Sequence, residues 1–132
     1  TVGAVQSAFL TGLREGLVLG VRGADGCVIC PPVEYDPATS DELTELVELP
    51  STGTVTTWSW EPAPRANQPL DRPFAWALVR LDGADTGLLH ALDAGSPDRV
   101  ATGMRVRVRW NGDREGAITD IACFEPLAEE DR

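Results

Sequence analysis

Residues 20–40, GVRGADGCVICPPVEYDPATS, divide the chain into two unlike parts. A short amphipathic segment precedes them, and a long remainder with β-strand patterns follows. They contain Cys27 and Cys30 with C-x-x-C spacing, which is typical of one half of a structural zinc site. Structural zinc takes four Cys or His ligands, and the only histidine, His90, is far along the chain. The first question is therefore whether this pair binds a metal.

The segment before this stretch predicts one helix. Its apolar residues recur every three or four positions, which gives a helix one apolar stripe. The stripe consists of Val5, Phe9, Leu10, Leu13 and Leu17. Gly12 and Gly16 weaken an isolated helix, so the stripe needs a surface to pack on. That surface is either the rest of the chain or a partner protein, and the sequence leaves both open.

Two short strands are expected at residues 17–22 and 27–29, because the Asp-Gly pair between them favours a hairpin turn. Pro31-Pro32 ends the second strand, since proline cannot donate to a β-ladder. Residues 36–42 are expected to form a turn that leads into a brief helical turn or coil. Together these elements predict a small knuckle-like subdomain.

From Leu46 onward the pattern changes to the period of two that is typical of strands. Five strands are expected, at residues 52–60, 74–81, 86–92, 104–110 and 118–124. The first is predicted to place Thr54, Thr56, Trp58 and Trp60 on one face and Val55, Thr57 and Ser59 on the other. The proline-containing residues 61–72 predict a long loop. Five strands with this spacing of connections fit an OB-fold barrel.

Composition and charge exclude some classes of function. The 132 residues are 42% hydrophobic and include 13 glycines and 10 prolines, which is typical of a folded, loop-rich domain. The 21 acidic residues outnumber 11 basic ones, all of them arginine, and the net charge is -10. Nucleic-acid binding depends on neutralising phosphates with cationic side chains. The charge therefore disfavours nucleic acid as a partner.

Other features concern the compartment. No apolar run approaches the roughly 20 residues that span a bilayer, and no signal-peptide pattern is present. The chain has three cysteines, which is too few for a disulfide framework, and an odd number leaves one of them unpaired. We therefore expect a soluble, cytoplasmic protein without a membrane partner. The chain begins at Thr1, which suggests either trimming or the excision of a domain from a longer polypeptide.

The order of these parts resembles one family. The segments that carry the resemblance are FLTGL at 9–13, Pro31-Pro32, ELPSTGTVTTW at 48–58, DRPFAWALVRLDG at 71–83 and GMRVRVRW at 103–110. They are similar to the family in which a rubredoxin-like zinc ribbon precedes an OB-fold, found beside thiolase-like enzymes of acyl-CoA metabolism. The resemblance covers nearly the whole chain. It implies a mainly-β fold: an N-terminal α-helix, a degenerate zinc ribbon and a five-stranded OB-fold barrel.

Within this family the chain most resembles the C-terminal domains of steroid side-chain acyl-CoA hydratase subunits. The resemblance implies an adaptor that binds and supports a thiolase-fold retro-aldolase of the lipid-transfer-protein type in cholesterol side-chain degradation. A MaoC-like hydratase domain, expected on the same full-length chain, would place two consecutive steps side by side. No cofactor is expected on this domain, and a coenzyme A thioester would be the substrate of the complex.

The resemblance also sets the register of the ribbon. In the family a C-x-x-C-G knuckle precedes Pro-Pro, and a second C-P-x-C knuckle follows. Alignment on Pro31-Pro32 places other residues at the four ligand positions, namely Arg22, Asp25, Asp36 and Thr39. Cys27 and Cys30 then fall between the knuckles. We expect a ribbon without metal, held instead by a salt bridge from Arg22 to Asp25 or Asp36, with residual metal binding by the two cysteines left open.

Other candidate chemistries are weaker. His90 has Asp93 and Ser96 nearby in the sequence, but a catalytic triad is defined by geometry and its members usually come from different elements. Cys123 lies between apolar residues, which favours a buried side chain over a nucleophile. No pair of nucleophile and base is identifiable. No catalytic residue is therefore assigned, and the domain is not expected to be an enzyme by itself.

Two sets of residues are candidates for partner contacts. The apolar set is Phe9, Leu10, Leu13, Leu17, Trp58 and Trp60. Tryptophans on an OB-fold can stack nucleobases, fill the barrel or anchor a protein interface, and the net charge favours the last two. The basic set is Arg105, Arg107 and Arg109, spaced about 7 Å apart on one strand face. These arginines would pair with the chain's own carboxylates, or contact an acidic partner or the phosphates of coenzyme A.

Three classes of function remain. The preferred one is a non-catalytic adaptor of an acyl-CoA aldolase complex. The alternatives are an OB-fold module for nucleic acid and a subunit that binds or processes coenzyme A thioesters in a thiolase or synthase complex. The predicted organisation is a helix at 1–16, a degenerate ribbon at 17–48, an OB-fold at 49–126 and an acidic tail at 127–132.

Overall fold

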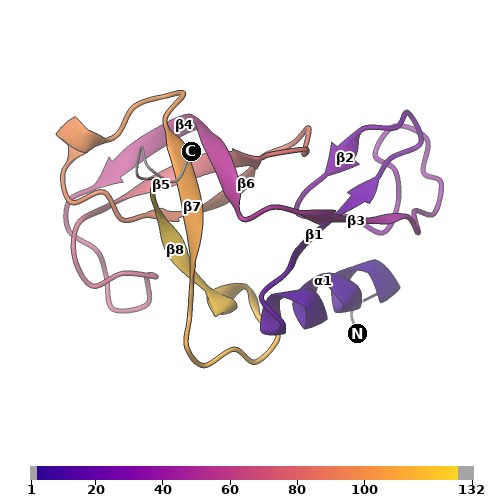
Figure 1. The fold of residues 1–132 in the computed structure, drawn as a ribbon, viewed down its shortest axis with the longest axis horizontal. Helices are drawn as coiled ribbons and strands as arrows, with labels where there is room; N and C mark the ends of the chain where they lie inside the picture. The colour runs from indigo at the N-terminus through magenta and orange to yellow at the C-terminus, as the bar shows by residue number, and fades with distance from the viewer. Residues whose placement is uncertain (1–2, 128–132) are drawn as a thin grey trace.

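The computed structural model describes residues 3–127, which form two parts lying side by side (Figure 1). One part is a three-stranded ribbon, and the other is a closed barrel of five strands. The helix α1 (Ala4–Arg14) lies along the ribbon, and the C-terminal end of the helix contacts the barrel. The predicted mainly-β class is confirmed. Apart from Leu127, the predicted acidic tail lies outside the described residues.

The helix forms where the apolar spacing predicts it, and distant residues bind both of its ends. The Glu34 carboxylate accepts hydrogen bonds from the N–H groups of Val5 (3.2 Å) and Gln6 (2.6 Å). Unpaired N–H groups and the helix dipole favour an anion at this position. At the last turn, Arg114 Nε donates to the carbonyl oxygen of Arg14 (3.0 Å). The ribbon thus binds one end of α1 and a barrel loop binds the other. Within residues 3–127, no helix has the length and apolar character needed to cross a membrane.

The ribbon consists of three antiparallel strands in the order β2–β1–β3. Their bounds are Val18–Arg22 for β1, Val28–Ile29 for β2 and Leu46–Leu49 for β3. The first two form the predicted hairpin, in which Gly26 has a φ of 89°, a conformation that favours glycine. The predicted ribbon at 17–48 includes most of β3, but no separate strand was expected there. The strand forms because its residues pair with β1, with Leu49 opposite Val18.

Five strands close the barrel in the order β4–β5–β6–β8–β7, which confirms the predicted five-stranded barrel. Their bounds are Thr52–Glu61 (β4), Phe74–Leu81 (β5), Leu88–Leu92 (β6), Arg105–Trp110 (β7) and Ile121–Pro126 (β8). Two 3-10 helices lie in the connections, η1 (Pro97–Arg99) and η2 (Ile118–Asp120). The second replaces the start of the predicted fifth strand, because the Asp120 carboxylate accepts N–H groups from Glu115, Gly116 and Ala117 and folds this segment back.

The predicted alternation of β4 is wrong beyond its middle. The register of β4 against β5 shifts between Val55 and Thr57, so that Thr56 is the extra residue of a β-bulge. Val55 is buried in the barrel core before the bulge, and Trp58 and Trp60 pack against the same core after it. Side chains alternate with a period of two, so one extra residue moves all the following ones to the other face.

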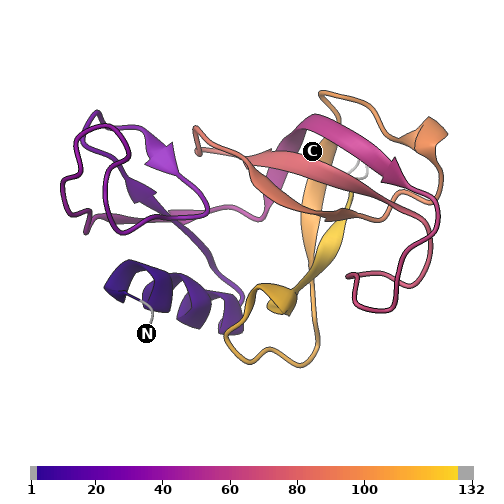
Figure 2. The same cartoon turned by 180° about the vertical axis from the view of Figure 1, so that it is seen from behind.

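The β5–β6 hairpin extends from the barrel to the ribbon and joins them (Figure 2). Val28 donates to Asp85 Oδ2, and the Asp85 N–H donates to the Val28 carbonyl, both at 2.8 Å. Thr86 Oγ1 accepts from the Cys30 N–H (2.8 Å) and donates to the Cys30 carbonyl (3.0 Å). One hydrophobic core runs through the joint, since buried residues of helix, ribbon and barrel form a single cluster.

Candidate functional site

Of the four residues that the resemblance places at zinc-ligand positions, Arg22 and Asp36 make other contacts in the structure. Arg22 Nε donates to Glu45 Oε2 (2.5 Å), and its Nη1 donates to the Gly26 carbonyl (2.9 Å). The predicted salt bridge of Arg22 with Asp25 or Asp36 is therefore wrong. The reason is the third strand, because β3 follows directly after Glu45 and keeps that residue next to β1, where Arg22 donates its backbone N–H to the Glu45 carbonyl (2.8 Å).

Asp36 holds the two knuckle positions together. Its Oδ2 accepts the N–H of Ala24 (2.8 Å), and its Oδ1 accepts those of Ala38 (2.8 Å) and Thr39 (3.0 Å). The first donor lies in the first knuckle and the other two in the second. These hydrogen bonds stabilise the carboxylate and lower the pKa of Asp36. Asp36, whose residue surface is only 6% exposed, thus links the two loops in which the resemblance places the zinc-ligand positions.

The two ribbon cysteines do not fit a zinc site. Cys27 is exposed, whereas Cys30 is buried with its thiol donating to the Leu19 carbonyl (3.8 Å). Burial raises the pKa of Cys30 to about 12, and a hydrogen bond and the charge of Asp25 raise the pKa of Cys27. Zinc binds thiolates. Residues 3–127 contain no group of three or more potential Cys, His, Asp or Glu ligands. The side chains present therefore do not suit tetrahedral zinc.

The apolar stripe of α1 packs inside the chain. Phe9 is 2% exposed and Leu13 is fully buried in the main core, and Leu10 packs against that core. Leu17 follows the helix and is half-buried. The assignment of this stripe to a partner surface is corrected for Phe9 and Leu13, because neither side chain is accessible. Of the two surfaces that the sequence left open, the stripe packs on the chain's own ribbon and barrel.

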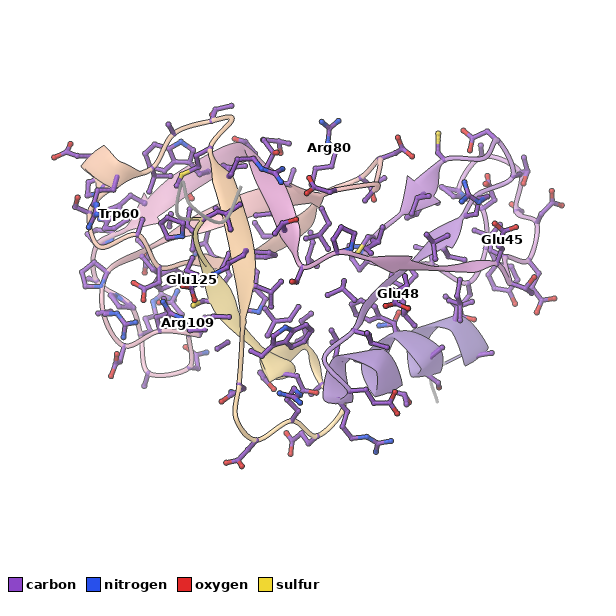
Figure 3. The ribbon with its side chains drawn as sticks, viewed as in Figure 1. Glu45, Glu48, Trp60, Arg80, Arg109 and Glu125 are labelled. Atoms are coloured by element: carbon purple, nitrogen blue, oxygen red, sulfur yellow. The ribbon has the colours of Figure 1, made fainter. Side chains whose placement is uncertain are left out.

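The two tryptophans of β4 have mixed positions. Trp58 and Trp60 are half-buried and pack against the barrel core, which the bulge at Thr56 makes possible. Trp60 lies at the end of the barrel remote from the ribbon (Figure 3). Trp58 also borders a hollow on the outer surface. Only part of each indole is therefore available to a partner.

The three arginines of β7 all bind carboxylates of the chain itself. Arg105 makes a two-point contact with Asp82, with Nη1–Oδ1 and Nη2–Oδ2 both at 2.7 Å. Arg107 pairs with Glu125 at 3.4 Å, and Arg109 pairs with Glu125 at 2.9 Å. Of the contacts that the sequence allowed for these arginines, the structure therefore shows pairing with the chain's own carboxylates. The three side chains do not form a free cationic surface.

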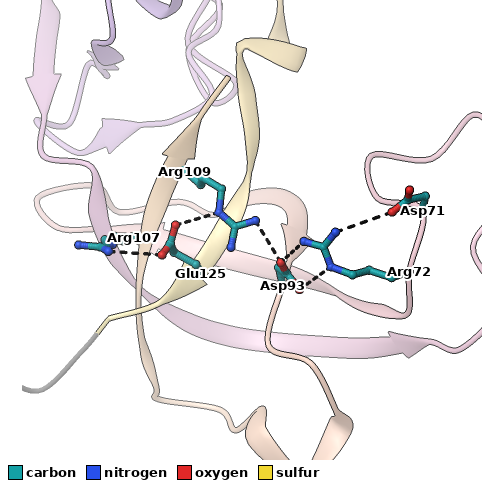
Figure 4. A network of polar contacts seen from close by, with 6 residues as sticks. All are labelled: Asp71, Arg72, Asp93, Arg107, Arg109 and Glu125. Atoms are coloured by element: carbon teal, nitrogen blue, oxygen red, sulfur yellow. Dashed lines mark hydrogen bonds and ion pairs between the residues drawn. The ribbon is translucent and has the colours of Figure 1, made fainter. Parts of the chain in front are cut away.

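Arg109 extends this network across the barrel surface (Figure 4). Its Nη1 donates to Asp93 Oδ2 at 3.0 Å, and Arg72 binds the same carboxylate from the long loop. Arg72 Nη1 also lies 3.7 Å from Asp71 Oδ1. Hydrogen bonds and charge from Arg72 and Arg109 lower the pKa of Asp93. The network of Figure 4 contains three arginines and three carboxylates, so its charges balance.

The triad suggested by sequence proximity is not assembled. The Asp93 carboxylate is bound by Arg72 and Arg109 on the outside of the barrel. His90 is buried, packs edge-on against Phe124 and accepts the Ala91 N–H at Nδ1 (2.8 Å). Burial also lowers the pKa of His90, which favours the neutral imidazole. His90 thus serves as a core side chain.

Cys123 is likewise a structural residue. It is fully buried in a small apolar cluster with Phe74 and Ala91. Burial raises its pKa, so the thiol form is favoured over the nucleophilic thiolate. Cys123 behaves as the small buried hydrophobic residue that the sequence predicted.

The structure also shows an apolar outer surface that sequence reasoning missed. Alternate residues of β5 face the barrel core, and the others, including Trp76 and Leu78, face outward beside Leu89 of β6. We call the hollow above them the outer groove. It has a volume of about 450 Å³ and is lined by Thr57, Trp58, Ser59, Trp76, Leu78 and Leu89. Residues 74–79 are apolar at every position, which is typical of a strand covered on both faces and is the signal that could have revealed this surface.

A second hollow continues from the outer groove. Its volume is about 440 Å³, it shares Trp76 and Leu89 with the groove, and it extends to Ile118. Its polar lining consists mainly of the amide and hydroxyl side chains of Asn67, Gln68, Asn111 and Thr119. We call it the adjoining hollow. Together the two form a continuous, largely apolar surface on the outside of the barrel.

Comparison with known families identifies a match. The model of the family described as ChsH2, C-terminal OB-fold domain, matches residues 46–111, which run from the start of β3 to the end of β7. No curated protein matches the chain.

Solved structures share the fold. The structure described as the Ltp2-ChsH2(DUF35) aldolase has a TM-score of 0.69 at 22% identity, over 96% of this chain and 97% of that one. A protein of unknown function of the DUF35 family from Sulfolobus solfataricus has a TM-score of 0.65 at 21% identity, over 82% and 77% of the two chains. The similarity to the first structure includes the helix and the ribbon as well as the barrel, because it spans almost the full chain.

Proposed function

The chain belongs to the family of the ChsH2 C-terminal OB-fold domain, and from this premise we propose that it is a non-catalytic accessory domain of a thiolase-fold acyl-CoA aldolase. In this role it binds the aldolase and supports its folded, active form. The family match carries the proposal, together with a fold shared over 96% of the chain with a structure whose name joins Ltp2 and ChsH2(DUF35) in one aldolase.

The chemistry of the chain supports an accessory role. Its buried thiols, Cys30 and Cys123, have raised pKa values, and its histidine is a neutral core residue. The carboxylates of Asp82, Asp93 and Glu125 are bound by arginines. Such groups stabilise a fold and are not poised as nucleophile or base. What the chain offers to another molecule is surface, above all the outer groove.

The proposal extends to the pathway. The aldolase acts on steroid side-chain acyl-CoA in cholesterol degradation, and a MaoC-like hydratase domain on the same full-length chain supplies its substrate. Linking two modules gives effective concentrations on the order of millimolar for short flexible linkers. Such a link would favour transfer of the coenzyme A thioester between consecutive steps. This domain itself carries no cofactor in the proposal.

The proposed accessory function does not require coenzyme A to contact the β7 arginines. The phosphates of coenzyme A would have to displace the carboxylates that already bind Arg105, Arg107 and Arg109. These exposed pairs are individually weak, about 0–1 kcal/mol each, but displacing several at once leaves carboxylates beside the incoming phosphates. We therefore assign the arginine network a structural role.

Co-expression with a thiolase-fold aldolase of the lipid-transfer-protein type tests the proposal. We expect the two proteins to elute together from size-exclusion chromatography, and aldol cleavage to require the complex. The isolated domain should cleave no acyl-CoA substrate. An aldolase that is soluble and fully active alone would contradict the proposal, as would turnover by the isolated domain.

A further inference from the structure

We propose that the outer groove and the adjoining hollow form the docking site for the aldolase, which inserts an uncharged aromatic or aliphatic side chain between Trp76 and Leu89. The inference rests on the proposed function for the identity of the partner. It adds the surface that binds and the chemistry of the contact.

The absence of charge around the two hollows is the first argument. Fifteen residues line them in the described part of the chain, and none is Asp, Glu, Lys or Arg. Charged residues make up 24% of the chain, so composition alone would place about four there. The cores of protein interfaces are depleted of charge and enriched in aromatic residues, with a polar rim. Trp76 and Leu89 supply such a core here, and the amides of Asn67, Gln68 and Asn111 supply part of the rim.

The exposure of large apolar side chains is the second argument. Leu89 exposes 59% of its surface although β6 lies between two other strands, and Ile118 exposes 41%. Both border the adjoining hollow. Trp76 packs edge-on against Phe74, with ring centroids 5.2 Å apart, which holds its indole in place. An anchor site built on strands and a packed ring loses little conformational freedom on binding, and this favours affinity.

The charge of the ribbon indicates which residues accompany the inserted apolar side chain on the partner. Residues 17–48 of the ribbon contain seven acidic residues and one basic residue, whereas residues 49–127 contain ten and eight. Glu45 and Glu48 are exposed on the ribbon (Figure 3). Thr86, which binds the ribbon, is only three residues before Leu89, so the groove lies at the end of β6 nearer the ribbon. A partner large enough to reach from the groove to the ribbon would meet a part of the chain that is on balance acidic. Such a partner is complementary if basic residues accompany its apolar side chain.

Matched aspartate substitutions test the site in the full chain with the co-expressed aldolase. Leu89→Asp places a charge at the centre of the groove, and Leu46→Asp places the same charge on an exposed leucine of β3. Thr57→Asp and Thr102→Asp form a second pair, inside and outside the groove. We expect the groove variants to weaken binding at least tenfold and the controls less than about threefold, because a charge buried without a partner opposes association. Unfolding midpoints measured for all four variants identify any that bind weakly through misfolding.

The outcomes separate the two proposals. If the unaltered chain binds the aldolase and both groove variants bind equally well, the docking site is wrong and the accessory role stands. Weakening by Leu46→Asp alone would place the site on the ribbon and also overturn this inference. If the unaltered chain does not bind, the accessory role itself fails. The association rate should fall as salt rises from about 50 to about 300 mM, and a rate independent of salt would contradict the basic flank.

Discussion

The ribbon has three short strands, shares a small apolar cluster with α1 and contributes a few residues to the main core, whereas the barrel surrounds most of that core with large, fully buried side chains. In the ribbon, Asp36 joins the knuckle loops through hydrogen bonds to backbone N–H groups. In the barrel, side chains such as Phe124 and Ile121 have no exposed surface. The barrel is therefore stabilised mainly by apolar burial, which depends little on pH, although the carboxylates Asp93 and Asp120 also have lowered pKa values there. The ribbon has less apolar burial of its own, so we expect Asp36 to contribute a larger share of its stability.

The ribbon also differs from a zinc ribbon in what links its loops. A metal ion binds four side chains and contributes its binding free energy to folding. Here a carboxylate accepts three N–H groups, and β2 gains further hydrogen bonds from Asp85 and Thr86 of the barrel. The ribbon thus relies on its neighbour as well as on Asp36. This dependence can be tested by weakening each part separately.

The largest effect is expected from Phe124→Ala in the barrel. The side chain is fully buried and packs edge-on against His90, so its removal leaves a cavity in the main core. We expect a loss of about 3–5 kcal/mol in the free energy of unfolding. Chemical denaturation followed by tryptophan fluorescence measures it. Leu89→Ala is the control, because a residue 59% exposed should change stability by about 0.5 kcal/mol or less. A loss below about 1 kcal/mol for Phe124→Ala would contradict the tight packing of the barrel core.

A smaller effect, confined to the ribbon, is expected from Asp36→Asn. The amide retains the size of the carboxylate but loses its charge, and its NH₂ group faces an N–H donor. The unfolding midpoint should fall, and more than it does for Glu45→Gln, which alters an exposed pair with Arg22. Amide exchange of Ala24, Ala38 and Thr39 should accelerate while that of β5 does not. Unchanged exchange at these three residues would show that the carboxylate does not hold the knuckles.

The same residue predicts a pH dependence. The pKa of Asp36 is lowered in the folded state by its backbone hydrogen bonds. Its contribution is therefore fully present above the unfolded-state pKa, about 3.9, and is lost as the pH falls through the lower folded-state value. The unaltered chain should lose stability more steeply than Asp36→Asn in this acidic range. Parallel pH profiles for the two chains would contradict the assignment.

A still smaller effect is expected from the pair Arg105 and Asp82. Both side chains are about one-third exposed, so solvent screens their two-point contact. A double-mutant cycle with both alanine substitutions should give a coupling of about 0.5–1 kcal/mol. Since the contact is electrostatic, the coupling should shrink in about 1 M salt. A coupling that stays the same at high salt would mean that packing accounts for it.

Removal of metal should have no effect. Because Asp36 links the loops and the thiol pKa values of Cys27 and Cys30 are raised, chelation with EDTA should leave the unfolding midpoint unchanged. Elemental analysis should give well below one zinc per chain. A midpoint that falls after chelation and recovers with added zinc would show that the ribbon uses a metal after all.

Local patterns in the sequence predicted most of the elements. The apolar spacing of residues 5–13 located α1, and period-two runs located the barrel strands to within a few residues. The interpretation of the ribbon was less successful. Register on Pro31-Pro32 moved Cys27 and Cys30 away from the ligand positions, but the partner of Arg22 was misassigned. A pairing across 23 residues depends on which strand lies beside β1, and no local pattern encodes that.

The candidate site was predictable only in part. Pairing of the β7 arginines with the chain's own carboxylates was one of three alternatives that the sequence allowed, and the helix stripe had two possible surfaces. The choice in each case depended on long-range contacts, such as Arg109 with Asp93 and Phe9 with the core. The outer groove combines residues of three strands, so its shape has no counterpart in any single stretch of sequence.

Residues 20–40 illustrate the division. Their residues predicted a hairpin, a proline stop and a turn, because turn and strand preferences are local properties of the backbone. The register that moved the cysteines off the ligand positions came from the resemblance to the zinc-ribbon family. Other features are visible only in the folded chain. Asp36 joins the knuckle loops, the backbone of Cys30 binds Thr86, and the β-bulge at Thr56 changes which side chains of β4 face the core. These features arise when distant segments compete for the same hydrogen bonds and the same space in the core, and that competition is resolved only in three dimensions.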